Sequence, residues 1–205
     1  MQDFWEIIKT RRSVRKFKKD PVPDAVILKI IEAGSFAPSG NNKQNWHFIV
    51  VKTPSIIKAM ADAVRAKADE LAKVIGSQED KRKFLKYTEF YTVFERAPVT
   101  IACVAQPYES PATKIFRTHG IFKEYKSTGG LQGVSAAIEN ILLSAKALGY
   151  GSCWMTGPMI ARAELGKILG IVPPDELISL VPLGLPDENQ ITPPRKKVDD
   201  IVTFK

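Results

Sequence analysis

The sequence predicts one domain of the α+β class, and three observations carry this prediction. The chain has 205 residues, of which 44% are apolar, enough to bury one sizeable core without disulfides or a structural metal. Helical patterns come first, and short apolar patterns typical of strands are scattered through the rest. Strands and helices alternate too seldom for a doubly wound parallel sheet. We therefore expect a single domain over residues 1–205.

The first half of the chain is predicted to place helices around one buried strand. Phe4, Ile7 and Ile8 recur at helical spacing and mark a short amphipathic helix. Pro21 and Pro23 end this region, because proline breaks a helix interior but suits the first position of the next helix. In chain order we then expect a helix from Pro23 to Gly34, a loop over residues 38–42, a strand at residues 46–51, and two exposed charged helices between Ser55 and Arg96 that join at Gly76 and Ser77.

The second half is predicted to hold the main core helix and the remaining strands. Residues 98–105 (PVTIACVA) are apolar and β-rich, which favours a buried strand. Between Gln106 and Thr128, prolines, glycines and scattered aromatic residues indicate a long loop with a helical piece. The elements expected after this loop are a core helix from Gly130 to Leu148, a strand at residues 152–155, a helix at residues 163–169, a strand at residues 177–183 and a terminal apolar segment at residues 201–204.

Composition narrows the class of protein and its compartment. Cys103 and Cys153 lie in apolar stretches, and with His47 and His119 they match no zinc-ligand spacing, so we expect buried thiols and no metal site. The glycine pair in residues 149–151 follows a helix and so is not a dinucleotide fingerprint. No apolar run reaches the ~18 residues of a membrane helix, and the first residues lack a signal-peptide core. This predicts a cytoplasmic protein.

The net charge is +8, from 30 basic and 22 acidic residues, and six of the positive charges lie within residues 11–19. Nucleic acid, an acidic membrane surface or a phosphorylated small molecule would each suit this charge. For the three lysines of the run, a solvated face is the simplest interpretation. Arg11, Arg12, Ser13 and Arg15 favour the small molecule, because guanidinium groups and a hydroxyl close together can hold a phosphate with charge-assisted hydrogen bonds.

Three further segments carry groups suited to a flat, phosphorylated ligand. Residues 38–46 (PSGNNKQNW) offer amides and a hydroxyl that can hydrogen-bond the edges of a heterocycle. Residues 149–158 (GYGSCWMTGP) lie at a predicted strand end, where small residues allow a ligand close to the backbone. Arg195, within residues 193–197 (PPRKK), supplies a further guanidinium for a phosphate.

Together these four segments resemble the nitroreductase family of flavin mononucleotide (FMN) enzymes, in which an Arg-Arg-Ser-x-Arg start, a Pro-Ser-x-x-Asn-x-Gln-x-Trp loop, a late Gly-x-Gly segment and a Pro-x-Arg tail recur in this order. The resemblance spans essentially the whole chain. It implies a nitroreductase-like fold with a central, mostly antiparallel sheet flanked by helices, and a variable helical or lid insertion at about residues 63–128. It also implies an intertwined homodimer with FMN at the subunit interface, each site lined by both chains.

The resemblance implies cofactor-binding roles residue by residue. Arg11, Arg12 and Ser13 would lie around the FMN phosphate and ribityl chain, and Arg195 would complete the phosphate clamp. Arg15 would face the pyrimidine edge of the flavin, where a positive charge favours the reduced, anionic cofactor. The residues expected at the ring edges, at the ribityl hydroxyls or along the N5 side of the ring are Ser39, Gly40, Asn42, Met155, Thr156 and Gly157.

The implied reaction is a ping-pong oxidoreduction with NADH or NADPH as the electron donor. The nicotinamide passes hydride to flavin N5 and leaves, and an electron-poor small molecule, such as a nitroaromatic or a quinone, takes its place. The protein holds the reacting atoms about 3 to 3.5 Å apart and needs no acid or base of its own. No catalytic side chain is therefore certain, and Thr156 is the candidate hydrogen-bond donor to N5.

The identity of the acceptor stays open. The same scaffold serves dehalogenation of iodotyrosine and oxidative fragmentation of the flavin, and residues 11–15 and 37–40 are similar to the deiodinase branch. That branch holds an amino-acid zwitterion with a glutamate, tyrosine and lysine lid, whereas Tyr91 stands where we expect the lysine. The residues predicted to select the acceptor as a lid are Phe90, Tyr91, Phe116, Phe122 and Tyr125.

Two alternatives come from other classes of protein. A basic nucleic-acid-binding module could use residues 11–19, but the sequence has no reading helix or aromatic and basic sheet motif. A protein that binds FMN for sensing or storage could carry the same motifs without turnover. The favoured partners are therefore FMN, a second copy of the chain and a small-molecule acceptor, with no nucleic acid and no membrane.

Overall fold

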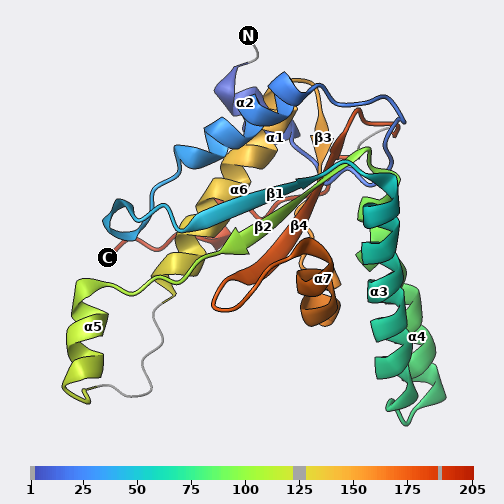
Figure 1. Cartoon of the computed structure of the whole chain (residues 1–205). Helices are drawn as coiled ribbons and strands as arrows, with labels where there is room; N and C mark the ends of the chain where they lie inside the picture. The colour runs from blue at the N-terminus through green and yellow to red at the C-terminus, as the bar shows by residue number, and fades with distance from the viewer. Residues whose placement is uncertain (1–2, 122–127, 189–190) are drawn as a thin grey trace.

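The computed structural model describes residues 3–121, 128–188 and 191–205. Its centre is a four-stranded sheet in the order β1, β2, β4, β3, in which all neighbouring strands are antiparallel (Figure 1). This confirms the α+β class and the mostly antiparallel sheet. The strands are β1 (Trp46–Val51), β2 (Val99–Ala105), β3 (Gly151–Ser152) and β4 (Glu176–Gly184).

Helices cover both faces of this sheet and extend beyond it (Figure 1). The helices α2 and α6 lie side by side on one face of the sheet, whereas α3 and α4 form a long hairpin on the side of the other face. The α-helices are α1 (Phe4–Thr10), α2 (Asp24–Ser35), α3 (Pro54–Lys73), α4 (Gln78–Thr88), α5 (Pro111–Thr118), α6 (Gly129–Ala147) and α7 (Arg162–Leu169), and the 3₁₀ helices are η1 (Gly40–Asn42), η2 (Glu89–Arg96), η3 (Gly157–Ala161) and η4 (Val198–Asp200).

The core consists of two apolar layers, one on each face of the sheet. Ile101 of β2 belongs to the layer under α2 and α6, together with Ile30 and Ile138. Its neighbour Ala102 belongs to the other layer, with Leu165 of α7 and several side chains of α3. Successive residues of a strand point to opposite faces, so a strand buried on both faces needs an unbroken apolar run. This explains why β2 reads as continuous apolar sequence.

Most of the predicted elements are confirmed, and the differences are local. The strand at residues 46–51 has its predicted bounds, and the break near Gly76 separates α3 from α4. Pro23 lies directly before α2, at the N-cap, and not at the first helical position. The α-helix predicted to continue to Arg96 ends at Thr88, and the 3₁₀ helix η2 follows it.

The predicted strand at residues 152–155 is wrong in its length, and Pro182 supplies the physical reason. The strand β3 pairs with β4 only through Gly151 and Ser152, and pairing resumes at Met155, which exchanges two backbone hydrogen bonds with Leu180. In this register Cys153 lies opposite Pro182. Because proline has no N–H to donate, the hydrogen-bonded pair expected between them cannot form.

Both ends of the chain expose apolar side chains. The helix α1 buries none of its residues, and Phe4 and Trp5 are each more than 60% exposed. All residues from 191 to 205 are exposed, including Phe204 at 94%. The terminal apolar segment at residues 201–204 therefore does not pack on its own domain.

Candidate functional site

Five of the residues predicted to bind the cofactor line one cavity of about 450 Å³. Four guanidinium groups and one hydroxyl line it, and they come from both ends of the chain. We call it the arginine cavity. Its lining residues are Arg11, Arg12, Ser13, Arg15, Glu188, Ile191, Pro193 and Arg195.

Backbone pairing holds the N-terminal wall of the arginine cavity in place. The Val14 N–H donates to the Ser152 carbonyl at 3.0 Å, which joins residues 13–14 to β3. Val14 is buried against Gly151, where an added Cβ would come within 2.7 Å of the valine side chain. Gly151 thus allows the close approach of Val14, whereas the sequence predicted that small residues here would admit a ligand.

The four arginines of the cavity differ in how many hydrogen bonds and ion pairs their guanidinium groups already make within the protein. Arg12 donates from Nη1 to the carbonyls of Lys9 and Arg11, and from Nη2 to the Thr192 hydroxyl at 2.8 Å. Arg11 lies 3.5 Å from a carboxylate oxygen of Glu139 on α6. Among the described residues, the side chain of Arg195 has no hydrogen bond or ion pair. Arg12 is therefore mainly a tie between chain segments, and Arg195 is free to bind a ligand.

One unsatisfied donor indicates that the cavity takes an anion. The Nε of Arg12 is buried and has no hydrogen-bond partner among the described residues. A buried donor left without a partner costs about 1 to 3 kcal/mol. An anionic ligand with several oxygens, such as a phosphate monoester, would satisfy this donor and neutralise the neighbouring guanidinium groups.

The loop that contains Ser39, Gly40 and Asn42 does not line the arginine cavity. It packs on the first turns of α6, where a Cβ added to Gly133 would lie 3.3 Å from Ser39. The Ser39 hydroxyl accepts a hydrogen bond from the Gln44 N–H at 2.9 Å. We call residues 38–44 the amide loop. Within one chain, it is separate from the predicted phosphate site.

The amide loop has unusual backbone geometry. Asn41, Asn42 and Gln44 have φ values of 51°, 52° and 49°, in the left-handed region that non-glycine residues rarely adopt. Such conformations cost about 1 to 3 kcal/mol each and cluster at functional sites. Gly40 does not have a positive φ. A Cβ added at Gly40 would lie 2.2 Å from the Tyr108 hydroxyl, so a larger residue there would need the Tyr108 side chain to shift.

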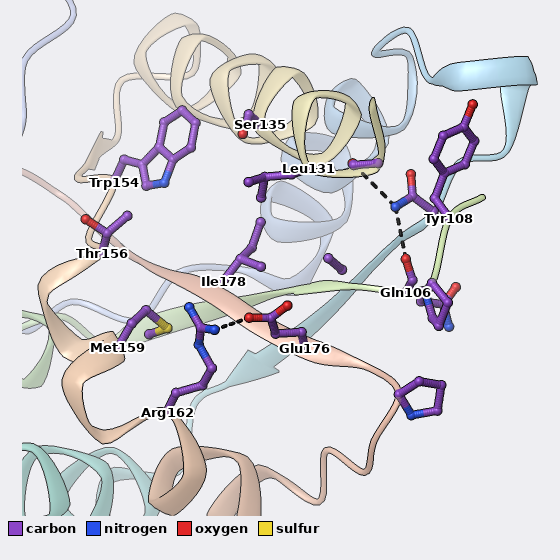
Figure 2. A pocket seen from close by; sticks show the side chains of 15 residues that line it. Gln106, Tyr108, Leu131, Ser135, Trp154, Thr156, Met159, Arg162, Glu176 and Ile178 are labelled. Atoms are coloured by element: carbon purple, nitrogen blue, oxygen red, sulfur yellow. Dashed lines mark hydrogen bonds and ion pairs between the residues drawn. The ribbon is translucent and has the colours of Figure 1, made fainter. Parts of the chain in front are cut away.

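A second cavity, of about 610 Å³, lies between Tyr108 and Leu131 on one side and Thr156 on the other (Figure 2). Trp154 and Ile178 form part of its apolar wall. Arg162 and Glu176 form an ion pair at its edge, and both side chains are about half exposed. Thr156, the candidate hydrogen-bond donor to the flavin, lines this second cavity.

The neighbours of Thr156 are held by the core. Met155 is buried through its bridge to β4, and Gly157 lies against the Tyr91 ring, which an added Cβ would approach to 2.2 Å. Of the three residues, Thr156 alone lines the cavity. Tyr91 is half-buried, and loss of solvent together with the nearby Tyr87 raises the pKa of its hydroxyl.

The lid residues that the structure describes lie on two separate elements, Phe90 and Tyr91 on η2 and Phe116 on α5. Phe90 is exposed on η2, and Tyr91 next to it packs against the core. Phe116 belongs to α5, which stands apart from α3 and α4 (Figure 1). Phe122 and Tyr125 lie outside the described residues.

The two cysteines are buried thiols, as predicted. Burial raises the pKa of Cys103 to about 12. Burial also raises the pKa of Cys153, although Arg15 and Arg11 act against this effect. Neither thiol is activated as a nucleophile at neutral pH.

The described part of the chain holds neither a metal-binding cluster nor a membrane-spanning helix. Residues 3–121, 128–188 and 191–205 contain no group of three or more His, Cys, Asp or Glu side chains that could hold a metal ion. No helix in these same ranges is long and apolar enough to cross a bilayer.

Sequence reasoning missed Glu188, Tyr108 and the Arg162–Glu176 pair. Glu188 lines the arginine cavity although it belongs to no recognised motif. Tyr108 fills the space that Gly40 leaves beside the amide loop. Gly40 and Gly130 both lie against Tyr108, but they are far apart in the sequence, so no local pattern could have revealed this contact.

The fold is an α+β domain, and its arginine cavity carries the donors that an anionic ligand would need. Residues 8–185 match the model of the Nitroreductase family, and the chain belongs to this family. An Archaeoglobus fulgidus relative, provisionally named an NADH dehydrogenase/NAD(P)H nitroreductase, is 31% identical over 93% of this chain and 89% of its own length. The iodotyrosine deiodinase of Hydra vulgaris is 29% identical over 98% of this chain and 72% of its own.

A solved structure also resembles the whole chain. The crystal structure of a BluB-like flavoprotein from Clostridium difficile has a TM-score of 0.92 to this chain, with 34% identity and complete coverage of both chains. The fold is thus the nitroreductase-like fold expected from the motifs.

Proposed function

We propose that this chain is an FMN-dependent oxidoreductase that takes electrons from NADH or NADPH and passes them to an electron-poor small molecule. One observation carries the proposal: the arginines of two distant motifs meet in a single cavity with a buried, unsatisfied donor. The similarity to the NAD(P)H nitroreductase and the BluB-like flavoprotein supports the choice of cofactor and donor.

The arginine cavity fits the phosphate end of FMN. Arg195, which the protein leaves unpaired among its described residues, supplies the main guanidinium for the phosphate. Arg11 and Ser13 would hold phosphate or ribityl oxygens, and Arg12 would donate from Nε while it keeps the wall in shape. Arg15 would lie nearer the ring, where its fixed positive charge favours added electrons.

The second cavity would provide the reaction space. Bound FMN would supply the hydride and electron chemistry, with the nicotinamide and the acceptor using the same face in turn, in a ping-pong cycle. Thr156 would donate a hydrogen bond to the ring edge from its backbone N–H or its hydroxyl. The apolar wall around Trp154 and Ile178 would exclude water and orient a flat substrate.

We further propose that the active species is a homodimer in which each flavin contacts both chains. The amide loop is predicted to bind the cofactor, yet it lies outside the arginine cavity of its own chain. The exposed apolar residues of α1 and of the tail at residues 198–204 suit burial against a second copy. Ser39, Gly40 and Asn42 of the partner subunit are therefore expected to complete the site.

The acceptor is proposed to be a nitroaromatic, a quinone or a similar compound. Reductive dehalogenation is the second candidate, because iodotyrosine deiodinases are among the relatives. Tyr91 stands where the deiodinase branch is expected to have its lid lysine, and it packs against Gly157. This position does not favour dehalogenation. Phe90, Phe116, Phe122 and Tyr125 remain the candidates for an acceptor lid.

An absorbance spectrum of the purified protein, followed by anaerobic addition of NADH or NADPH, tests the proposed function. We expect flavin bands that the nicotinamide bleaches, a heat-released chromophore identified as FMN, and reoxidation by a nitroaromatic or a quinone. Bound flavin that neither nicotinamide reduces would show a non-catalytic flavoprotein. A colourless protein that also fails to bind added FMN would contradict the proposal.

A further inference from the structure

The carboxylate of Glu188 occupies hydrogen-bond donors inside the arginine cavity. Its Oε1 accepts from the Arg15 N–H at 2.6 Å and lies 3.4 Å from the Lys16 N–H. Glu188 also lines the cavity. A negative group is therefore present where four guanidinium groups converge.

These two donors are of the kind that binds phosphate in other sites. Both N–H groups approach the same Glu188 oxygen, and guanidinium groups next to such donors increase the affinity for an anion. The Arg15 guanidinium is assigned to the flavin ring and Lys16 to a solvated face, but the contact with Glu188 uses the backbone N–H groups of these residues at the cavity wall. The Glu188 carboxylate thus takes the position of one anionic oxygen at this wall.

The fold presents Glu188 at this place through backbone pairing. The Lys18 N–H donates to the Leu185 carbonyl at 2.9 Å, and the Asp187 N–H donates to the Lys16 carbonyl at 3.0 Å. These bonds hold residues 185–187, which follow β4, alongside residues 16–18. Glu188 is the next residue after this paired segment. The backbone bonds that hold the cavity wall therefore also place the Glu188 side chain at the cavity.

The charges of the cavity show what this carboxylate does. Four arginines line it, Glu139 offsets Arg11 from α6, and Glu188 is the carboxylate among the lining residues. A phosphate monoester carries close to two negative charges at neutral pH. A carboxylate that shares the cavity repels such a group, and it also holds the backbone donors that the group could use.

We propose that Glu188 is an internal competitor for the phosphate of the cofactor. This inference rests on the proposed function, since the arginine cavity is taken as the FMN phosphate site. Binding of the phosphate displaces the carboxylate from the Arg15 and Lys16 N–H groups or proceeds against its repulsion. The protein therefore binds FMN less tightly than its arginines alone would allow. The loss of binding free energy arises at the phosphate and not at the flavin ring.

Dissociation constants for FMN and for riboflavin, measured by flavin fluorescence on flavin-depleted protein, test this proposal. Glu188→Gln should bind FMN about tenfold more tightly than wild type, because one like charge near the phosphate is gone. Glu188→Ala should show at least as large an increase, because it also frees the backbone donors. Riboflavin, which lacks the phosphate, should bind all three proteins equally.

The matched control is Asp187→Asn, which removes a neighbouring carboxylate that does not line the cavity. It should leave both dissociation constants unchanged. Weaker FMN binding in Glu188→Gln and Glu188→Ala, or equal shifts for FMN and riboflavin, would overturn the proposal and make Glu188 a support for the wall.

Failure of the proposed function would look different. In that case wild type would bind neither flavin, and calorimetry with inorganic phosphate would test Glu188 alone. Tighter phosphate binding by Glu188→Gln would support internal competition in the arginine cavity. Equal phosphate binding by both proteins would overturn it.

Discussion

The arginine cavity and the amide loop are predicted from motifs of the same kind, but they differ in how one chain builds them. Residues from both ends of the sequence meet in the arginine cavity. The amide loop packs on α6 and Tyr108 instead, and none of its residues lines that cavity. A shared motif therefore indicates that residues serve one site, but it does not indicate that they serve it within one chain.

The two regions also differ in what holds them in shape. Backbone hydrogen bonds to β3 and to residues 185–187 fix the wall of the arginine cavity. The amide loop keeps three non-glycine residues at positive φ and depends on the Tyr108 ring beside Gly40. Backbone pairing therefore positions one wall of the cavity, whereas side-chain packing holds the loop in its strained conformation.

The largest effect is expected from a comparison of two arginines of the cavity. Arg195→Ala should weaken FMN binding about 30- to 150-fold, because each charge-assisted contact contributes about 2 to 3 kcal/mol, and should leave the thermal stability of the flavin-free protein unchanged. Arg12→Ala should instead lower stability, because it breaks bonds to Lys9, Arg11 and Thr192. Flavin titration and thermal melting of both variants measure this difference. Equal losses of affinity and stability in the two variants would remove the distinction between ligand and structural arginines.

A smaller effect is expected in the amide loop. Gly40→Ala should destabilise the protein by up to about 1 kcal/mol, because the new Cβ displaces the hydroxyl end of the Tyr108 ring. Tyr108→Ala in the same chain should recover most of this loss, since it removes the clash. Urea unfolding of the single and double variants measures the coupling. Independent, additive effects would show that the loop is not held by Tyr108.

The smallest effect is expected in the alkylation rates of the two cysteines, which report on the charge near each thiol. Arg15 lowers the pKa of Cys153, so Arg15→Ala should raise that pKa further. Alkylation of Cys153 at alkaline pH should then slow by about two- to fivefold, because less thiolate forms. Cys103, with a pKa of about 12 in the core, should show no change. A similar slowing at both cysteines would indicate a global change in stability and not the charge of the cavity.

Much of the fold follows from local patterns, and the exceptions have physical causes. The continuous apolar run of β2 and the helical period of α6 are strong signals because both elements are buried in the core. The early end of β3 depends on Pro182, which is distant in sequence and acts only through strand pairing. A local pattern cannot contain that information.

The site is predictable where a residue type is itself the signal. Arginines grouped with a serine indicate an anion site from the sequence alone, and Arg195 fits the same chemistry. Glu188 could not be found in this way, since a single glutamate after a strand is ordinary on a protein surface. Its role depends on the pairing of residues 185–187 with residues 16–18.

Complementation between two inactive variants tests most directly whether the arginine cavity of one chain and the amide loop of another form one site. One variant carries Arg15→Ala and Arg195→Ala, and the other carries Ser39→Ala and Asn42→Ala. Each alone should bind little FMN. After the two are unfolded and refolded together, about a quarter of all sites should bind FMN normally, because each mixed dimer then has one intact site. No recovery in mixed dimers that are shown to form would contradict a site shared between chains.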